Sequence, residues 1–158
     1  MLLYCHYHVR DPTMCLSKIK ALAYVTDSWI SPFVLDCTTA VDLVFVVDSS
    51  GSIGTANFIT VKKVIYKLIR HFSVTAFHAR IGIVQYATNA RVIFTLHQSQ
   101  RLGFHRLARR VTRMFYTKGG TKTGKGLWLA YRMLRYSKRK LDGKFLKHKQ
   151  VLFIIFSL

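Results

Sequence analysis

The stretch Asp42-Leu-Val-Phe-Val-Val-Asp48-Ser49-Ser50-Gly51-Ser52-Ile53-Gly54 decides the fold of this chain. Its apolar half, Leu43–Val47, is uninterrupted, as expected of a strand in a parallel sheet that is covered on both faces. The polar half places one carboxylate and two hydroxyls at alternate positions, Asp48, Ser50 and Ser52. Because alternate side chains of an extended segment face the same way, these oxygens can converge at the carboxyl end of the strand. A hard divalent cation such as Mg²⁺ accepts such ligands and fills its other positions with water or with a partner's oxygens.

Composition limits the class of protein. The chain has 158 residues, a length typical of one domain, and 51% of them are hydrophobic, which excludes a disordered chain. No apolar stretch reaches the roughly 18 residues that a transmembrane helix needs, and the N-terminus lacks the basic-then-apolar order of a signal peptide. Lys and Arg number 25 against six Asp and no Glu, a net charge of +19. This excess favours anionic partners and opposes the binding of a cation.

The rest of the chain predicts helices and strands in the order βαββααβ. Apolar residues recur at helical spacing between Phe58 and Phe72, with Thr55 as the N-cap. Arg80–Tyr86 and Arg91–Leu96 are rich in Val, Ile and aromatic residues and predict an antiparallel hairpin.

Two more helices and a final strand follow. The helices are predicted at about 101–114 and 124–139, and the apolar run Val151–Phe156 predicts the strand. We therefore expect an α/β fold: a Rossmann-like, mostly parallel sheet with helices on both faces and one antiparallel edge hairpin, incomplete at the C-terminus.

A second polar segment, Gly119-Gly-Thr121-Lys-Thr-Gly-Lys-Gly126, adds a glycine-rich loop. Together, Asp42–Gly54, Asn57–Lys62, Arg80–Tyr86 and Gly119–Leu127 resemble the von Willebrand factor A domain, most closely the extracellular-matrix type of matrilins, cochlin and non-fibrillar collagens. The resemblance covers about residues 40–156 in unbroken order. We expect residues 39–158 to form a partial domain of this type, preceded by an N-terminal extension, 1–38, of unknown structure.

The resemblance implies a function. In that family the first polar segment begins a metal-ion-dependent adhesion site (MIDAS), and by position Asp48, Ser50, Ser52 and Thr121 would be the metal ligands. The ion would be Mg²⁺, Mn²⁺ or Ca²⁺, and an acidic side chain of an extracellular-matrix protein such as collagen would complete its coordination. The resemblance thus implies a secreted, non-enzymatic adhesion module.

The sequence departs from the family at its end. Ser157 occupies the position of a second site aspartate, and the family's last strands and helices are missing, so we expect a C-terminally truncated chain. A carboxylate about 5 Å from a divalent ion contributes roughly 1.7 kcal/mol even at the dielectric of water, so its loss should weaken cation binding more than tenfold. With nothing after it, Val151–Phe156 should become an exposed, aggregation-prone edge strand.

Basic residues suggest an alternative function. Arg106, Arg109, Arg110 and Arg113 in one predicted helix, with Arg135 and Arg139 in the next, could bind a glycosaminoglycan or nucleic acid without metal. The simpler interpretation of these residues is that they form solvated helix faces.

Other interpretations of the two polar segments stay open. Gly119-x-x-x-x-Gly124-Lys125 matches a phosphate-binding P-loop until Gly126 replaces its Ser or Thr, and Ser50-Gly-Ser52-Ile-Gly54 nearly matches the nucleophile elbow of serine hydrolases. The first segment could also be a polar turn that binds no metal, and Thr121 could cap the following helix.

Overall fold

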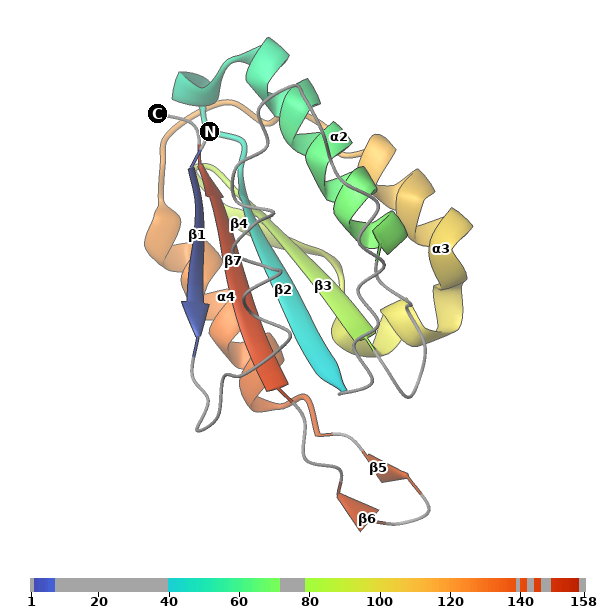
Figure 1. Ribbon diagram of the computed structural model, residues 1–158. Coiled ribbons are helices and arrows are strands. Elements are labelled where there is room, and N and C mark those ends of the chain that lie inside the picture. Colours follow the sequence, from blue (N-terminus) through green and yellow to red (C-terminus); the bar gives the residue numbers. More distant parts are fainter. Residues whose placement is uncertain are drawn as a thin grey trace.

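A computed structural model describes residues 2–7, 40–71, 79–138, 140–141, 144–145 and 149–156. It contains a five-stranded sheet in the order β1-β7-β2-β3-β4 with helices on both of its faces (Figure 1). The strands of this sheet are β1 (Leu2–Tyr7), β2 (Val41–Asp48), β3 (Ala79–Tyr86), β4 (Ala90–Phe94) and β7 (Lys149–Phe156). Two short strands, β5 (Lys140–Leu141) and β6 (Lys144–Phe145), form a separate antiparallel pair.

The central strand β2 is parallel to both of its neighbours, β3 and β7. Strand β4 returns antiparallel to β3, which confirms the predicted edge hairpin. In the parallel pair, Asp48 lies opposite Tyr86, so β2 and β3 deliver their last residues to the same edge of the sheet. The expected α/β fold with a mostly parallel centre is therefore confirmed.

Strand β1 corrects one expectation. It pairs antiparallel with β7 in a register that runs from Leu2 opposite Phe156 to Tyr7 opposite Val151. The prediction that Val151–Phe156 forms an exposed edge is therefore wrong, because β7 lies between β1 and β2. The physical reason is that the free backbone groups of an apolar edge pair with any segment able to extend beside them, and here the first residues of the chain do so.

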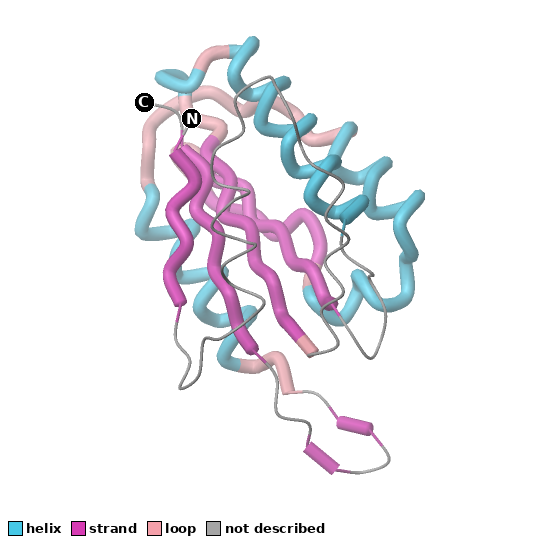
Figure 2. Tube along the Cα trace, in the orientation of Figure 1, coloured by secondary structure: helices cyan, strands magenta, loops and turns pink. Residues whose placement is uncertain are grey.

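In the described part of the chain, three long helices flank the sheet (Figure 2). Helix α2 (Thr55–His71) follows the short helix η1 (Gly51–Ile53). Thr55 is its first residue and not its N-cap, because the N–H of Phe58 already donates to the carbonyl of Gly54. Helix α3 (Leu96–Thr112) starts five residues before its predicted position. Thr95 caps it in a reciprocal pair of hydrogen bonds with Gln98, and Gly103, whose φ is +67°, kinks it. Helix α4 (Thr123–Arg135) ends earlier than the predicted residue 139.

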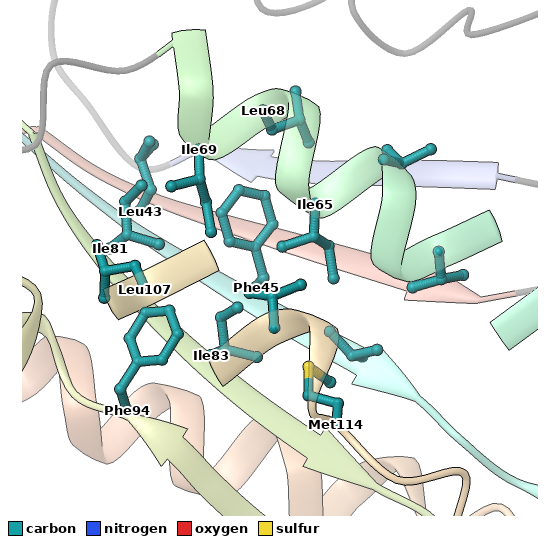
Figure 3. Packing of buried hydrophobic residues seen from close by; sticks show 14 of the residues in the cluster. Leu43, Phe45, Ile65, Leu68, Ile69, Ile81, Ile83, Phe94, Leu107 and Met114 are labelled. Carbon is teal, nitrogen blue, oxygen red and sulfur yellow. The ribbon is translucent and has the colours of Figure 1, made fainter. Parts of the chain in front are cut away.

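The core has two layers because β2 is buried on both faces. Leu43 and Phe45 point to one face, where α2 and α3 pack over the sheet (Figure 3). Val44 and Val46 point to the other face, which is covered by α4. This arrangement explains why the strand is an uninterrupted apolar run, and it leaves the end of β2 as the place where polar side chains appear.

Candidate metal centre at the carboxyl end of the sheet

The chain turns sharply after β2, and Asp48 holds the turn. Its side-chain oxygen Oδ1 accepts a hydrogen bond of 2.7 Å from the backbone N–H of Ser50. The N–H of Ser49 donates to the carbonyl of Tyr86 at 2.8 Å, which ties the start of the loop to β3. Asp48 is only 4% exposed and Ser50 is fully buried. The carboxylate is thus fixed at the rim of the sheet with one oxygen occupied by the backbone.

The two serine hydroxyls lie side by side in this turn. The Oγ atoms of Ser50 and Ser52 are 3.0 Å apart, and the Ser52 side chain is exposed. Oxygens bound to Mg²⁺ at about 2.0–2.1 Å in octahedral geometry are separated by about 2.9 Å when they are adjacent. The hydroxyl pair therefore has the spacing of two neighbouring ligands, and oxygen donors are the type that hard cations take. The residues present fit a divalent ion.

The glycine-rich loop lies against the first loop. Its Gly119 carbonyl accepts a hydrogen bond of 2.9 Å from the N–H of Gly51, and the hydroxyls of Thr117 and Ser49 are 2.5 Å apart. The Tyr116 hydroxyl lies 3.0 Å from the carbonyl oxygens of both Ser50 and Gly51. These contacts bring two segments that are distant in the sequence to one end of β2.

Thr121 sits in this second loop with an exposed side chain. Its two neighbours are anchored, since the N–H of Gly120 donates to Thr88 Oγ1 and the N–H of Lys122 donates to the carbonyl of Ala87, each at 2.9 Å. Lys122, at the N-cap of α4, makes no side-chain capping bond. The structure therefore brings Asp48, Ser50 and Ser52 together and places Thr121 on the adjoining loop.

Sequence reasoning missed Tyr86. Its ring is buried, and burial raises the pKa of its phenol above the ordinary value of 10.0; the charge of Asp48 and a hydrogen bond with that carboxylate raise the pKa further, whereas a bond with Thr123 opposes the shift. The raised pKa keeps the phenol protonated beside the Asp48 carboxylate. A Cβ at Gly126 would lie 2.8 Å from the Tyr86 ring, so α4 approaches this ring only through a glycine. Pairing the predicted strands Leu43–Val47 and Arg80–Tyr86 in parallel would have placed Tyr86 opposite Asp48 and revealed its role.

The site is poor in acidic groups. The described part of the chain has two carboxylates, Asp42 and Asp48, and Asp42 is bound in an ion pair with Arg80. Among the described residues no three His, Cys, Asp or Glu side chains gather in a metal-binding group, so a cation here must rely on hydroxyls. Ser157 lies outside the described residues.

The basic residues of the alternative hypothesis do not form one patch. Arg106, Arg109, Arg110 and Arg113 are exposed on α3 or at its end, whereas Arg135 is exposed on α4. Helices α3 and α4 cover opposite faces of the sheet. Arg139 lies outside the described residues. The sequence could not reveal this separation, because it depends on which face each helix covers.

Comparisons with known proteins settle the family. The von Willebrand factor type A domain family matches this chain over residues 42–157. The chain belongs to this family. It is 40% identical to Matrilin-2 of Mus musculus over 95 residues, which are 58% of this chain and 9% of that protein. Its identity to the Collagen alpha-4(VI) chain of Mus musculus is 34% over 116 residues, 73% of this chain and 5% of the collagen chain.

Solved structures agree with this von Willebrand factor A (vWA) assignment. Proximal thread matrix protein 1 from the mussel byssus matches with a TM-score of 0.51 and 23% identity, over 58% of this chain and 24% of that one. A second structure of that protein, described as having a zinc-occupied MIDAS motif, matches with a TM-score of 0.51 and 22% identity, over the same shares. At this identity the likeness shows the fold. Among the described residues, no helix has both the length and the apolar character to cross a bilayer.

Proposed function

We propose that this vWA domain is a non-enzymatic adhesion module that binds an extracellular-matrix protein, such as a collagen, through a divalent cation. Asp48, Ser50, Ser52 and Thr121 would hold the ion, and an acidic side chain of the partner would occupy its open face. The observation that carries the proposal is the pair of hydroxyls of Ser50 and Ser52, 3.0 Å apart beside the fixed carboxylate of Asp48. The proposal includes an extracellular location, which the likeness to Matrilin-2 and to the Collagen alpha-4(VI) chain supports.

The ligand set suits a hard divalent ion, Mg²⁺, Mn²⁺ or Ca²⁺, because all of its donors are oxygens. A structural neighbour described with zinc in its MIDAS supports divalent binding in this fold. Affinity should be low, because Ser157 stands where the family has a second aspartate and because the chain carries a net charge of +19. A bound ion would supply the electrophilic centre for the partner's carboxylate, and Asp48, Ser50, Ser52 and Thr121 would fix its position.

The surroundings of the site favour an acidic partner. A hollow of about 290 Å³ beside the two loops is lined in part by Arg91, Thr117 and Lys118. The buried Gln85 holds Arg91 in place, since its Oε1 accepts bonds of 3.1 and 2.8 Å from the guanidinium. Gln85 in turn donates to the Phe115 carbonyl at 2.6 Å. An ordered cation in this hollow would attract a carboxylate and repel a basic partner.

Solid-phase binding to collagen would test the proposal. Binding should be lost in EDTA, should fall at least about tenfold in Ser50→Ala, and should change little with moderate salt. Thr60→Ala is the matched control, because it removes an exposed hydroxyl from α2 that bonds only locally, to the Ala56 carbonyl. Unchanged binding of matrix proteins in EDTA and in Ser50→Ala would contradict the proposal.

A further inference from the structure

Helix α4 exposes a surface that the metal site does not use. We call it the α4 surface and define it by residues on or just after this helix: Lys125, Trp128, Tyr131, Arg132, Arg135 and Tyr136. Trp128 is 56% exposed, Tyr131 54% and Tyr136 70%. Large aromatic side chains gathered in the open on one helix commonly mark a binding surface.

The arginines of this surface are held by its aromatic rings. The guanidinium of Arg132 lies 4.6 Å from the centre of the Trp128 ring. That of Arg135 lies 5.8 Å from the Tyr131 ring and 6.0 Å from the Tyr136 ring, and it donates a hydrogen bond of 2.7 Å to the Tyr131 hydroxyl. Stacking and hydrogen bonding restrict both side chains, so less conformational entropy is lost when they bind an anion.

Within the described residues, the positive charge of the α4 surface has no acidic counterpart. Of the two described carboxylates, Asp42 is paired with Arg80 and Asp48 is buried at the end of β2. Lys125 donates to neutral acceptors, the Thr88 carbonyl and the Asn89 side chain. Salt bridges within the described part of the chain therefore do not explain why these cations gather here.

An open hollow lies at the start of the same surface. It has a volume of about 590 Å³ and is lined by Asn89, Ala90, Gly124, Lys125, Trp128 and Leu129. Trp128 forms one wall and carries Arg132 on its ring. An apolar wall beside a lysine and an arginine suits a ligand that has both a ring face and anionic groups.

We propose that the α4 surface binds a sulfated polysaccharide, independently of the metal site. A guanidinium group presents a planar fork of hydrogen-bond donors that fits an oxyanion such as sulfate. A sulfated polysaccharide carries sulfate groups at intervals along its length, and the α4 surface carries its cations at intervals along the helix. Sugar rings lie against apolar faces, which Trp128 supplies in the hollow. Single-stranded nucleic acid fits less well, because it stacks successive bases on several aromatic rings, whereas the lining of this hollow includes one, Trp128.

Binding of a heparin oligosaccharide to the full chain, measured in EDTA, tests the proposal. The variant Arg132→Gln/Arg135→Gln should lose at least about tenfold in affinity, as expected when anchoring arginines are removed. Its matched control, Arg106→Gln/Arg109→Gln, removes the same charge from α3 and should lose less than about threefold. Equal losses in both variants would overturn the proposal, since net charge alone would then explain the binding.

Two further variants test the role of the rings. Arg132→Lys/Arg135→Lys keeps the charge but loses the planar fork, and Trp128→Ala removes the apolar wall; each should weaken binding at least about threefold, with unchanged thermal melting. Wild-type affinity in both variants would overturn the proposal. Tighter binding of a single-stranded oligonucleotide of equal charge would assign the surface to nucleic acid instead. Because EDTA is present throughout, failure here leaves the proposed metal-dependent adhesion untouched.

Discussion

The two ends of β2 carry the same residue type in opposite settings. At the amino end, the fully buried Asp42 forms an ion pair with Arg80 and accepts a hydrogen bond of 2.5 Å from the Ser137 hydroxyl. At the carboxyl end, Asp48 accepts a hydrogen bond from the backbone N–H of Ser50, and the strand register places Tyr86 opposite it. The first carboxylate is neutralised within the protein, whereas the second is held by a neutral donor. Asp42, which stabilises the fold, is thus paired with a cation. Asp48, the proposed metal ligand, is held in place but keeps its negative charge uncompensated by the described residues.

Helix α4 connects the two ends. Its thirteen residues span about 20 Å, which is about the length of β2 from Asp42 to Asp48. Thr123, at its start, bonds to the Tyr86 hydroxyl beside Asp48, and Ser137, just after its end, bonds to Asp42. One helix therefore supports the structural acid and the candidate metal site at once.

The largest effect is expected at Asp42. Asp42→Asn leaves the Arg80 guanidinium buried without a full counter-charge and should cost about 3–5 kcal/mol of unfolding free energy. Asp48→Asn keeps the oxygen that accepts the Ser50 N–H and should change the metal-free stability by less than about 1 kcal/mol. Urea unfolding of the two variants measures both values. Similar losses of unfolding free energy in the two variants would contradict the proposed difference between Asp42 and Asp48.

A change at Gly126 should have the next largest effect. In Gly126→Ala the new Cβ would lie 2.8 Å from the Tyr86 ring and 3.1 Å from Val46, so α4 must shift, at a cost of about 1–3 kcal/mol. Gly124→Ala is the matched control on the same helix, because a Cβ there meets nothing within 4 Å. The midpoints of denaturant unfolding of the two variants measure this difference in stability. Equal midpoints would contradict the close approach of α4 to Tyr86.

The phenol of Tyr86 should make stability depend on alkaline pH. Because the pKa of Tyr86 is raised in the folded state, the unfolded chain loses the phenol proton at a lower pH than the folded chain does. The contribution of Tyr86 to the unfolding free energy is therefore complete below about pH 10, and it declines as the pH rises from there toward the folded-state pKa. The decline is at most about 1.4 kcal/mol per pH unit. Unfolding free energies at about pH 9 and about pH 11 should differ less in Tyr86→Phe than in wild type. Tyr136→Phe, which alters an exposed ring, should behave as wild type, and an unaltered decline in Tyr86→Phe would refute the assignment.

The features that the sequence predicted well have local causes. The uninterrupted apolar run Leu43–Val47 predicted a strand that is buried on both faces, and the apolar spacing of α2 predicted a helix with one buried face. The structure has both features. The start of α3 was missed although the sequence contained its signal: Thr95 and Gln98 have the spacing of a capping box, but Thr95 was assigned to the preceding strand.

Other features depend on pairing between distant segments. No local pattern in residues 2–7 indicates a strand, and β1 is defined by its antiparallel pairing with β7 at the other end of the chain. In the same way, Asp48, Ser50 and Ser52 could be grouped from their alternation, whereas the contact of Asp48 with Tyr86 arises from the parallel register of two strands. The separation of the arginines onto two faces likewise follows from packing.

Calorimetric titration of Mg²⁺ or Mn²⁺ into the folded chain tests the central claim most directly. The account predicts uptake of one ion per chain with a dissociation constant of about 10⁻⁴–10⁻³ M, and loss of that uptake in Asp48→Asn. Absence of uptake at millimolar ion, or undiminished uptake by Asp48→Asn, would contradict it.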